Sequence, residues 1–156
     1  MNILITMLGR SVRGLVNSSW ASMREFNYVP DRVHIIASSV DSKDSSKAAA
    51  SLRIVLCAFG SPAEISIESV DGGVIGSVSA TIRKLLEHYR ENGDRIAIDV
   101  TSGTKDLVLG SIANDLSGVD HIFYLRIDSL RNADRPFILI PVEKQRMIDV
   151  LAEVRP

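Results

Sequence analysis

The sequence has 156 residues, of which 46% are hydrophobic and 24% charged, and its formal net charge is −1. The length fits one domain, and the composition is that of a globular protein, which excludes a disordered chain, a collagen and a disulfide scaffold. A protein that binds duplex DNA through bulk charge is expected to be basic, so the neutral balance argues against that class. Thirteen of the eighteen Lys and Arg residues are Arg, which suits bidentate contact with phosphate or carboxylate.

Short apolar runs alternate along the chain with longer segments of helical periodicity. Strands are predicted at 2–7, 33–38, 64–70, 94–100, 120–127 and 137–142. Helices are predicted at 11–26, 45–59, 74–92 and 106–116, with a C-terminal helix or arm at 143–156. The strict alternation of 64–70 is typical of a half-exposed edge strand, whereas a run such as Ile96-Ala97-Ile98 suits a buried central strand.

This order of elements indicates a single α/β domain over residues 1–156. We expect a Rossmann-like, mostly parallel sheet of order 3-2-1-4-5 with a terminal antiparallel strand, flanked by helices on both faces. In such a sheet the first and fourth strands are neighbours, and the winding direction reverses between them. Ligands bind at the carboxyl ends of the strands at that switch point. The turns after the first and fourth strands are therefore the expected site.

Cellular setting is indicated by what the sequence lacks. Cys57 is the only cysteine, so no internal disulfide can form, and we expect it to be a small buried apolar residue. The first residues lack the basic region of a signal peptide, and no run of about 18 apolar residues is present. We therefore expect a cytoplasmic protein without membrane contact.

The turn after the fourth predicted strand is rich in polar residues. Its sequence is Asp99-Val100-Thr101-Ser102-Gly103-Thr104-Lys105. Gly103 lets the backbone approach a ligand, and Thr104 and Lys105 open a helix whose N-terminal amides and dipole favour an anion. Lys105 adds a point charge suited to phosphate. The alternative interpretation is a capped helix start with Lys105 in solvent.

The turn after the first predicted strand is Leu8-Gly9-Arg10-Ser11-Val12-Arg13-Gly14. It places two arginines and a serine around a glycine, which suits an anionic ligand but also a plain surface turn. The spacing Gly-x-Gly-x-x-Gly is absent, so a dinucleotide fingerprint is not indicated, and neither turn has the Walker A spacing. Because both turns belong to one switch point, together they predict a phosphate-binding site.

The turn at 99–105 resembles that of the CARF family, the CRISPR-associated Rossmann-fold domains, in which an Asp-x-Thr-x-Gly-Thr-Lys pattern follows the fourth strand. The polar, glycine-containing turn after the first strand and the closing pair of strands also match. The resemblance covers about the whole chain. The family often has Gly-Gly-Thr-Lys where this chain has Ser102-Gly103-Thr104-Lys105.

The resemblance implies a homodimer that binds a cyclic oligoadenylate across its two-fold axis, because a symmetric ring fits a symmetric dimer. Members of the family usually carry an effector domain, for which we expect no room in 156 residues, so the chain resembles stand-alone ring nucleases. Such an enzyme opens the ring, with cyclic tetra-adenylate as the preferred candidate, and switches off type III CRISPR signalling. A ribose 2′-hydroxyl attacks the adjacent phosphate and leaves a 2′,3′-cyclic phosphate, so no metal or other cofactor is expected.

The two turns supply the candidate site residues. Ser11 and Lys105 are the candidate catalytic residues. The candidate ligand-binding residues are Leu8, Gly9, Arg10, Arg13, Ser39, Thr101, Ser102, Gly103 and Thr104. His34, His88 and His121 are scattered along the chain without metal-ligand spacing, and we expect structural roles for them.

Three alternatives to a ring nuclease stay open. A CARF sensor would bind the cyclic oligoadenylate without cutting it and regulate a partner. A nucleotide- or phosphosugar-binding Rossmann protein outside CRISPR systems is less favoured. A DNA-binding regulator is the least favoured, because the net charge is −1 and residues 143–156 are too few for a winged helix.

Overall fold

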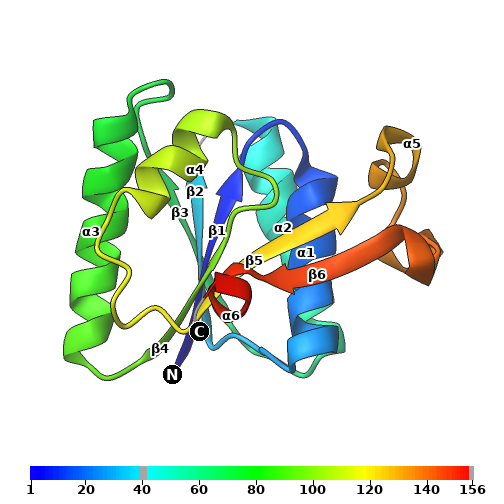
Figure 1. Ribbon diagram of the computed structural model, residues 1–156, viewed down its shortest axis with the longest axis horizontal. Coiled ribbons are helices and arrows are strands. Elements are labelled where there is room, and N and C mark those ends of the chain that lie inside the picture. The colour runs from blue at the N-terminus through cyan, green and yellow to red at the C-terminus, as the bar shows by residue number, and fades with distance from the viewer. Residues whose placement is uncertain (39–41, 155–156) are drawn as a thin grey trace.

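The computed structural model describes residues 1–38 and 42–154, which build one twisted sheet (Figure 1). Its six strands lie in the order β3-β2-β1-β4-β5-β6, with β1 to β5 parallel and β6 antiparallel to β5. The strands are β1 (Asn2–Leu8), β2 (Arg32–Ala37), β3 (Glu64–Ser69), β4 (Arg95–Asp99), β5 (His121–Ile127) and β6 (Gln145–Asp149). The predicted Rossmann-like order with a terminal antiparallel strand is confirmed.

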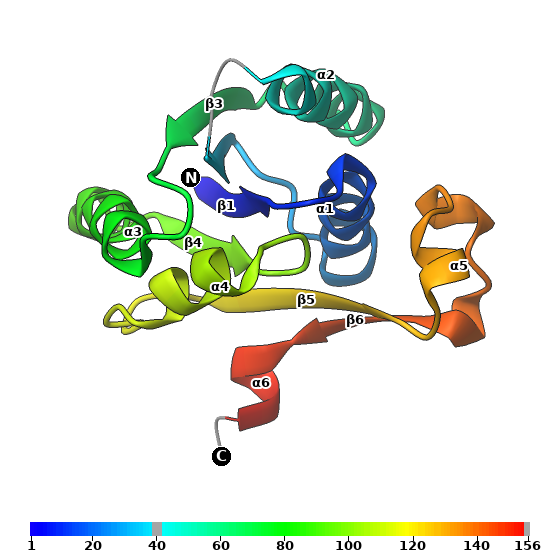
Figure 2. The same cartoon turned by 90° about the horizontal axis from the view of Figure 1, so that it is seen from above.

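Helices cover both faces of the sheet, with α1 and α2 on one face and α3 and α4 on the other (Figure 2). These helices are α1 (Val12–Phe26), α2 (Lys43–Ala58), α3 (Ile75–Glu91) and α4 (Lys105–Ile112). The shorter helices are α5 (Leu130–Ala133), the 3-10 turns η1 (Phe137–Leu139) and η2 (Val142–Lys144), and α6 (Val150–Val154). Among the described helices, none is both long and apolar enough to cross a membrane.

Alternate residues of the central strands fill two apolar cores. In β1, Leu4 and Leu8 pack into the core shared with α1 and α2, whereas Ile3, Ile5 and Met7 pack into the core beneath α3. All five side chains are buried. This alternation follows from the pleat of a strand, which sends successive side chains to opposite faces, and explains why the strand sequence is apolar throughout.

The C-terminal part differs from the prediction. The predicted strand at 137–142 is wrong: this segment contains η1 and η2, and the antiparallel strand β6 begins later, within the predicted helix or arm at 143–156. Phe137 and Ile140 are buried while Ile138 and Leu139 are more than 60% exposed. Burial at a spacing of three residues matches a 3-10 turn and not the two-residue period of a strand.

Two helix boundaries also differ. Ser42 caps α2, its Oγ accepting a hydrogen bond from the Ser45 amide at 3.0 Å, so the helix begins before the predicted caps Ser45 and Ser46. Helix α4 ends at Ile112, four residues earlier than expected.

Cys57 is exposed, which contradicts the expected burial. Helix α2 turns the neighbouring Leu56 to the core and Cys57 outward.

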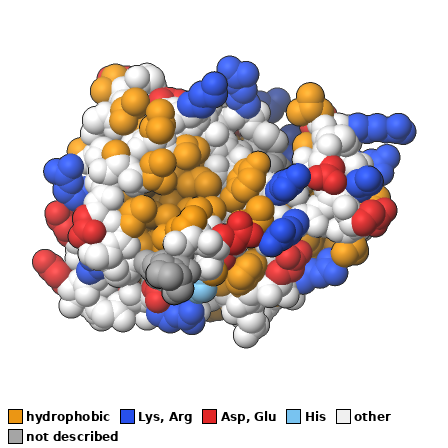
Figure 3. All heavy atoms as spheres, viewed as in Figure 1, with side chains coloured by type: hydrophobic (Ala, Val, Ile, Leu, Met, Phe, Trp, Pro, Cys, Tyr) orange, Lys and Arg blue, Asp and Glu red, His pale blue; other side chains and the backbone are white. Residues whose placement is uncertain are grey.

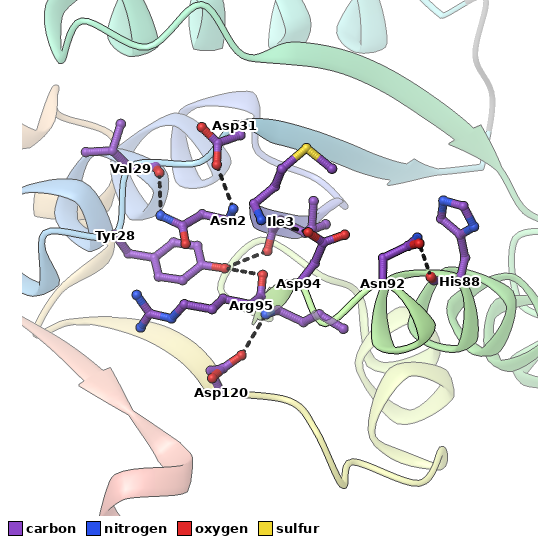
Figure 4. Close-up of polar contacts among 12 residues, drawn as sticks. Asn2, Ile3, Tyr28, Val29, Asp31, His88, Asn92, Asp94, Arg95 and Asp120 are labelled. Carbon is purple, nitrogen blue, oxygen red and sulfur yellow. Dashed lines mark hydrogen bonds and ion pairs between the residues drawn. The ribbon is translucent and has the colours of Figure 1, made fainter.

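A polar network closes the amino ends of the strands (Figure 4). The Tyr28 hydroxyl donates to the carbonyl oxygens of Ile3, at 2.8 Å, and Arg95, at 3.0 Å, and so bridges β1 and β4. The Asn2 amide group donates to the Val29 carbonyl at 3.0 Å, and the Ile96 amide donates to Asp120 at 2.7 Å. Burial raises the pKa of Tyr28, which keeps its hydroxyl protonated. Because these contacts occupy the amino ends of the strands, a ligand would bind at the carboxyl ends.

A buried carboxyl group ties β1, α1 and β4 together near the carboxyl edge. Asp99, the last residue of β4, accepts hydrogen bonds from the Thr101 amide, at 3.0 Å, and the Thr6 hydroxyl, at 3.2 Å. Ser18 Oγ lies against Asp99 Oδ2 and also 3.1 Å from the Leu15 carbonyl oxygen. A hydroxyl has one proton, so when Ser18 donates to Leu15, its contact with Asp99 needs a proton on the carboxyl group.

Burial is the largest influence on Asp99 and raises its pKa above the usual range, which favours the protonated form that this geometry can hold. A carboxyl group with a raised pKa in the folded state binds its proton more tightly there than in the unfolded chain. Its contribution to stability is therefore complete below the unfolded pKa and is lost as the pH rises through the folded pKa.

We expect Asp99→Asn to remove this pH dependence, because the amide is neutral and can donate to Ser18 Oγ at every pH. As the pH rises from 4 to 8, the wild-type free energy of unfolding should fall relative to that of Asp99→Asn, by about 1.4 kcal/mol for each unit by which the pKa is raised. Urea unfolding at several pH values measures this difference. Asp128→Asn, an exposed carboxylate, serves as the control, and a difference that stays constant with pH would contradict the assignment.

Candidate functional site

The turns after β1 and β4 pack directly against each other. The Gly9 amide donates to the Ser102 carbonyl oxygen at 2.9 Å, and the Ser102 hydroxyl donates to the Ser11 carbonyl oxygen at 2.6 Å. A Cβ atom on Gly9 would lie 2.2 Å from the Ser102 carbonyl oxygen, a distance that no side chain can accommodate without movement of the backbone. Glycine at position 9 therefore allows the two turns to pack together. The strand order predicts that they meet, because β1 and β4 are neighbours in the sheet.

A cleft of about 1080 Å³ opens where these turns meet, at the upper end of the range of small-molecule sites. Its lining comes from both turns, from the start of α4, from the carboxyl half of β5 and from the region of α5. The lining residues are Arg10, Ser11, Gly14, Thr101, Ser102, Gly103, Thr104, Lys105, Asp106, Tyr124, Leu125, Ile127, Leu130, Ala133 and Asp134. Seven of the eleven candidate residues from the sequence lie here.

The other four candidates have different places. Leu8 and Gly9 line an adjoining cavity of about 340 Å³, which shares Arg10, Thr104 and Asp106 with the cleft. Arg13 lines a separate cavity between α1 and α2. Ser11 is the extended N-cap residue before α1, whereas Arg13 lies in the first turn of the helix and lines this cavity instead of the cleft. Ser39 lies outside the described residues.

Ser11 keeps a hydroxyl proton available toward the cleft. It is the N-cap of α1, and its Oγ accepts a hydrogen bond from the Gly14 amide at 2.9 Å. Accepting this bond uses a lone pair and leaves the O–H free to donate. Ser102 differs, since it is 8% exposed and its hydroxyl already donates to the Ser11 carbonyl. Its side chain holds the turn in place.

Thr101 and Gly103 shape the wall and floor of the cleft. The Thr101 hydroxyl oxygen accepts a hydrogen bond from the Leu125 amide at 2.8 Å and so attaches the turn to β5. A Cβ atom on Gly103 would lie 2.8 Å from Met7 Sδ and 2.9 Å from Val108 Cγ2. Gly103 is therefore needed for close packing on the core.

Positive and negative groups share the mouth of the cleft. Lys105 begins α4 and is exposed, with no ion pair to any described residue. Beside it, Asp106 accepts a hydrogen bond from the Gly73 amide at 2.9 Å. Hydrogen bonds from the Thr104 hydroxyl and the Gly73 amide hold the pKa of Asp106 below its usual range. Arg10, Lys105 and the amides at the start of α4 are groups of the kind that can bind an anion such as phosphate.

The wall formed by β5 was not predicted from the sequence. This strand pairs with β4 only over His121, Ile122 and Phe123, while its continuation through Ile127 pairs only with β6. The second half of β5 therefore runs past the end of β4 and brings Tyr124, Leu125 and Ile127 to the cleft. The overhang arises because β4 ends at Asp99, opposite Phe123, whereas β5 continues to Ile127.

The histidines lie away from the cleft lining. His34 contacts the Tyr89 hydroxyl at 2.7 Å and Glu68 at 2.9 Å, and burial lowers its pKa. His121 contacts Asp149 at 2.8 Å. These partners fit the expected structural roles. Within residues 1–38 and 42–154, no group of three His, Cys, Asp or Glu side chains is arranged to hold a metal ion.

Comparison with solved structures identifies the fold. Enterococcus italicus Csm6 bound to cyclic hexa-2′-fluoro-hexa-dAMP matches with a TM-score of 0.59 and 16% identity, over 98% of this chain and 42% of that one. A type III CRISPR defence DNA nuclease activated by cyclic oligoadenylate matches with a TM-score of 0.54 and 18% identity, over 81% of this chain and 19% of that one. The chain thus spans less than half the length of either neighbour.

Sequence comparison adds no closer relative: no family model matches, and no curated protein sequence matches significantly. At 16% and 18% identity the structural likeness establishes the fold alone. The fold of this chain is CARF-like, as the resemblance of the turn at 99–105 implied.

Proposed function

We propose that the chain binds a cyclic oligoadenylate in the cleft and opens it by attack of a ribose 2′-hydroxyl on the adjacent phosphate. The observation that carries the proposal is the direct packing of the two switch-point turns, which brings Arg10, Ser11 and Lys105 to one cleft. The CARF-like fold supports it, since one structural neighbour holds a cyclic hexa-adenylate analogue and another is activated by cyclic oligoadenylate.

In the proposed reaction the nucleophile belongs to the substrate. The 2′ oxygen bonds to phosphorus, the bond from phosphorus to the 5′ oxygen breaks, and the product carries a 2′,3′-cyclic phosphate. The 2′-hydroxyl proton passes to water, and the leaving 5′ oxygen takes a proton from water. Lys105 stabilises the charge that builds on the phosphorane, Arg10 holds a phosphate, and the free O–H of Ser11 donates to the scissile phosphate.

A non-catalytic sensor is the second candidate, and one observation favours it. The described lining of the cleft contains no histidine. Of its two carboxylates, Asp106 already accepts two hydrogen bonds and Asp134 is exposed to solvent. General acid–base catalysis is most effective from a group with a pKa near the working pH. Cleavage here would depend on positioning and charge stabilisation, and a protein of this kind can bind the ring without cutting it.

Lys105→Ala should reduce the cleavage rate of cyclic tetra-adenylate about 10²–10³-fold, as is usual when one charge-stabilising donor is removed. Chromatography of the products, with EDTA present throughout, measures the rate and detects the 2′,3′-cyclic phosphate. Lys84→Ala, an exposed lysine of α3, is the matched control and should cleave normally. A native rate in Lys105→Ala would refute the catalytic role, whereas tight binding of an intact ring by the wild type would support the sensor.

The proposal includes a homodimer, and an apolar surface beside the cleft supports it. Leu109 and Ile112 of α4 are 49% and 43% exposed, and Tyr124 of β5 is 41% exposed. Figure 3 shows an apolar area in the middle of this face, over α4 and β5. A hollow of about 300 Å³, lined by Gly103, Lys105, Val108 and Leu109, joins this area to the cleft. A second copy seated here would bring two clefts together around a two-fold axis.

Leu109→Asp should convert a dimer into a monomer, because a buried unpaired carboxylate in the interface is strongly unfavourable. Sedimentation velocity at micromolar concentration measures the mass. Ile54→Asp provides the control, since Ile54 is 73% exposed on α2, away from this surface, and the change should leave the mass unaltered. A wild-type chain that sediments as a monomer with or without cyclic tetra-adenylate would rule out the dimer.

A further inference from the structure

A second cavity, of about 200 Å³, lies between α1, α2 and the chain at 136–137. Its lining residues are Val12, Arg13, Val16, Asn17, Trp20, Lys47, Ser51, Pro136 and Phe137. No residue of this lining also lines the cleft. A ligand in this cavity would therefore be separate from the one proposed above, and the inference does not depend on that function.

The wall of this cavity is fixed by a buried amide group. Asn17 is 2% exposed, its Nδ2 donates to the Arg135 carbonyl oxygen at 2.9 Å, and its Oδ1 accepts from the Phe137 amide at 3.0 Å. Both ends of the amide thus hold the chain at 135–137 against α1. The Arg24 guanidinium lies 5.6 Å from the centre of the Phe137 ring and packs on it as well. The cavity is therefore preformed.

Aromatic and aliphatic side chains supply an apolar surface inside the cavity. The Trp20 ring is half-buried, with its centre 6.1 Å from that of Phe137 at an interplanar angle of 35°. Phe59 meets Trp20 edge to face, with ring centres 6.4 Å apart. These two phenyl rings restrict the indole, which with Val12 and Val16 offers a fixed apolar surface suited to a flat ring.

Two cations flank this apolar surface without a partner of opposite charge. Arg13 and Lys47 are exposed, and neither forms an ion pair with any described residue. The described lining contains no acidic residue. Two positive charges at one cavity complement a dianion better than a single carboxylate, and phosphate is the common dianion of small metabolites.

We propose that this cavity binds a nucleoside monophosphate, with the base against Trp20 and the phosphate between Arg13 and Lys47. The enclosed volume is smaller than the roughly 300–1000 Å³ of sites that enclose a whole ligand. It suits the base alone, with the phosphate at the rim where the two cations lie. Ser51 can hydrogen-bond to the base or the ribose.

The only tryptophan of the chain lies in this cavity, so intrinsic fluorescence reports on its occupancy directly. Titration with adenosine 5′-monophosphate should produce a saturable change in Trp20 emission. Arg13→Gln and Lys47→Gln should each weaken binding by about tenfold or more, the usual effect of removing a charge-assisted hydrogen bond. The wild type should bind adenosine alone, or inorganic phosphate alone, no more tightly than these two variants bind the nucleotide.

Two control variants test whether the nucleotide binds in this cavity and not elsewhere on the protein. Arg53→Gln changes an exposed cation of α2 outside the lining and should bind the nucleotide like the wild type. Lys105→Ala changes the cleft and should also leave this titration unaltered, whatever its effect on cyclic tetra-adenylate. The proposal is overturned by the absence of a saturable change at millimolar nucleotide, by unaltered binding in Arg13→Gln and Lys47→Gln, or by loss of the signal in Lys105→Ala.

Discussion

The close contact of Gly9 with the Ser102 carbonyl oxygen is the constraint on which the site depends. Strand order makes the turns after β1 and β4 neighbours, but only a residue without Cβ at position 9 lets their backbones form a hydrogen bond. The bond from Ser102 to the Ser11 carbonyl then fixes the start of α1 against the start of α4. The position of Lys105 relative to Ser11 is therefore set by backbone packing and not by flexible side chains.

The buried carboxyl group under the turn affects the charge of the cleft above it. Asp99 lies six residues before Lys105 and is fully enclosed. An ionised group there would oppose the positive potential of Arg10, Lys105 and the amides at the start of α4. Burial raises the pKa of Asp99 above its usual range, which favours the neutral form. In that form the carboxyl group shapes the turn through hydrogen bonds without opposing this positive potential.

Sequence patterns predict the parts of this molecule that depend on periodicity. The apolar run of β1 and the order of strands and helices are enough to place the sheet and to bring the turns at 8–14 and 99–105 together. Other features depend on contacts between distant segments. The overhang of β5 depends on where β4 ends beside it, and the inward hydroxyl of Ser102 depends on Ser11. The 3-10 turn at Phe137–Leu139 depends on the Asn17 amide and the burial of Phe137.

The overhang of β5 gives the cleft a wall that is mechanically distinct from the rest of the sheet. Beyond Phe123 this strand pairs with no strand but β6, so the wall is a two-stranded ribbon, attached to the turn after β4 through Leu125 and Thr101. Two-stranded ribbons are more strongly twisted than wider sheets. Tyr124, which lines the cleft, pairs across the ribbon with Ile148. Substitutions at these two positions would therefore change the wall of the cleft while the buried strands β1, β2 and β4 keep their packing.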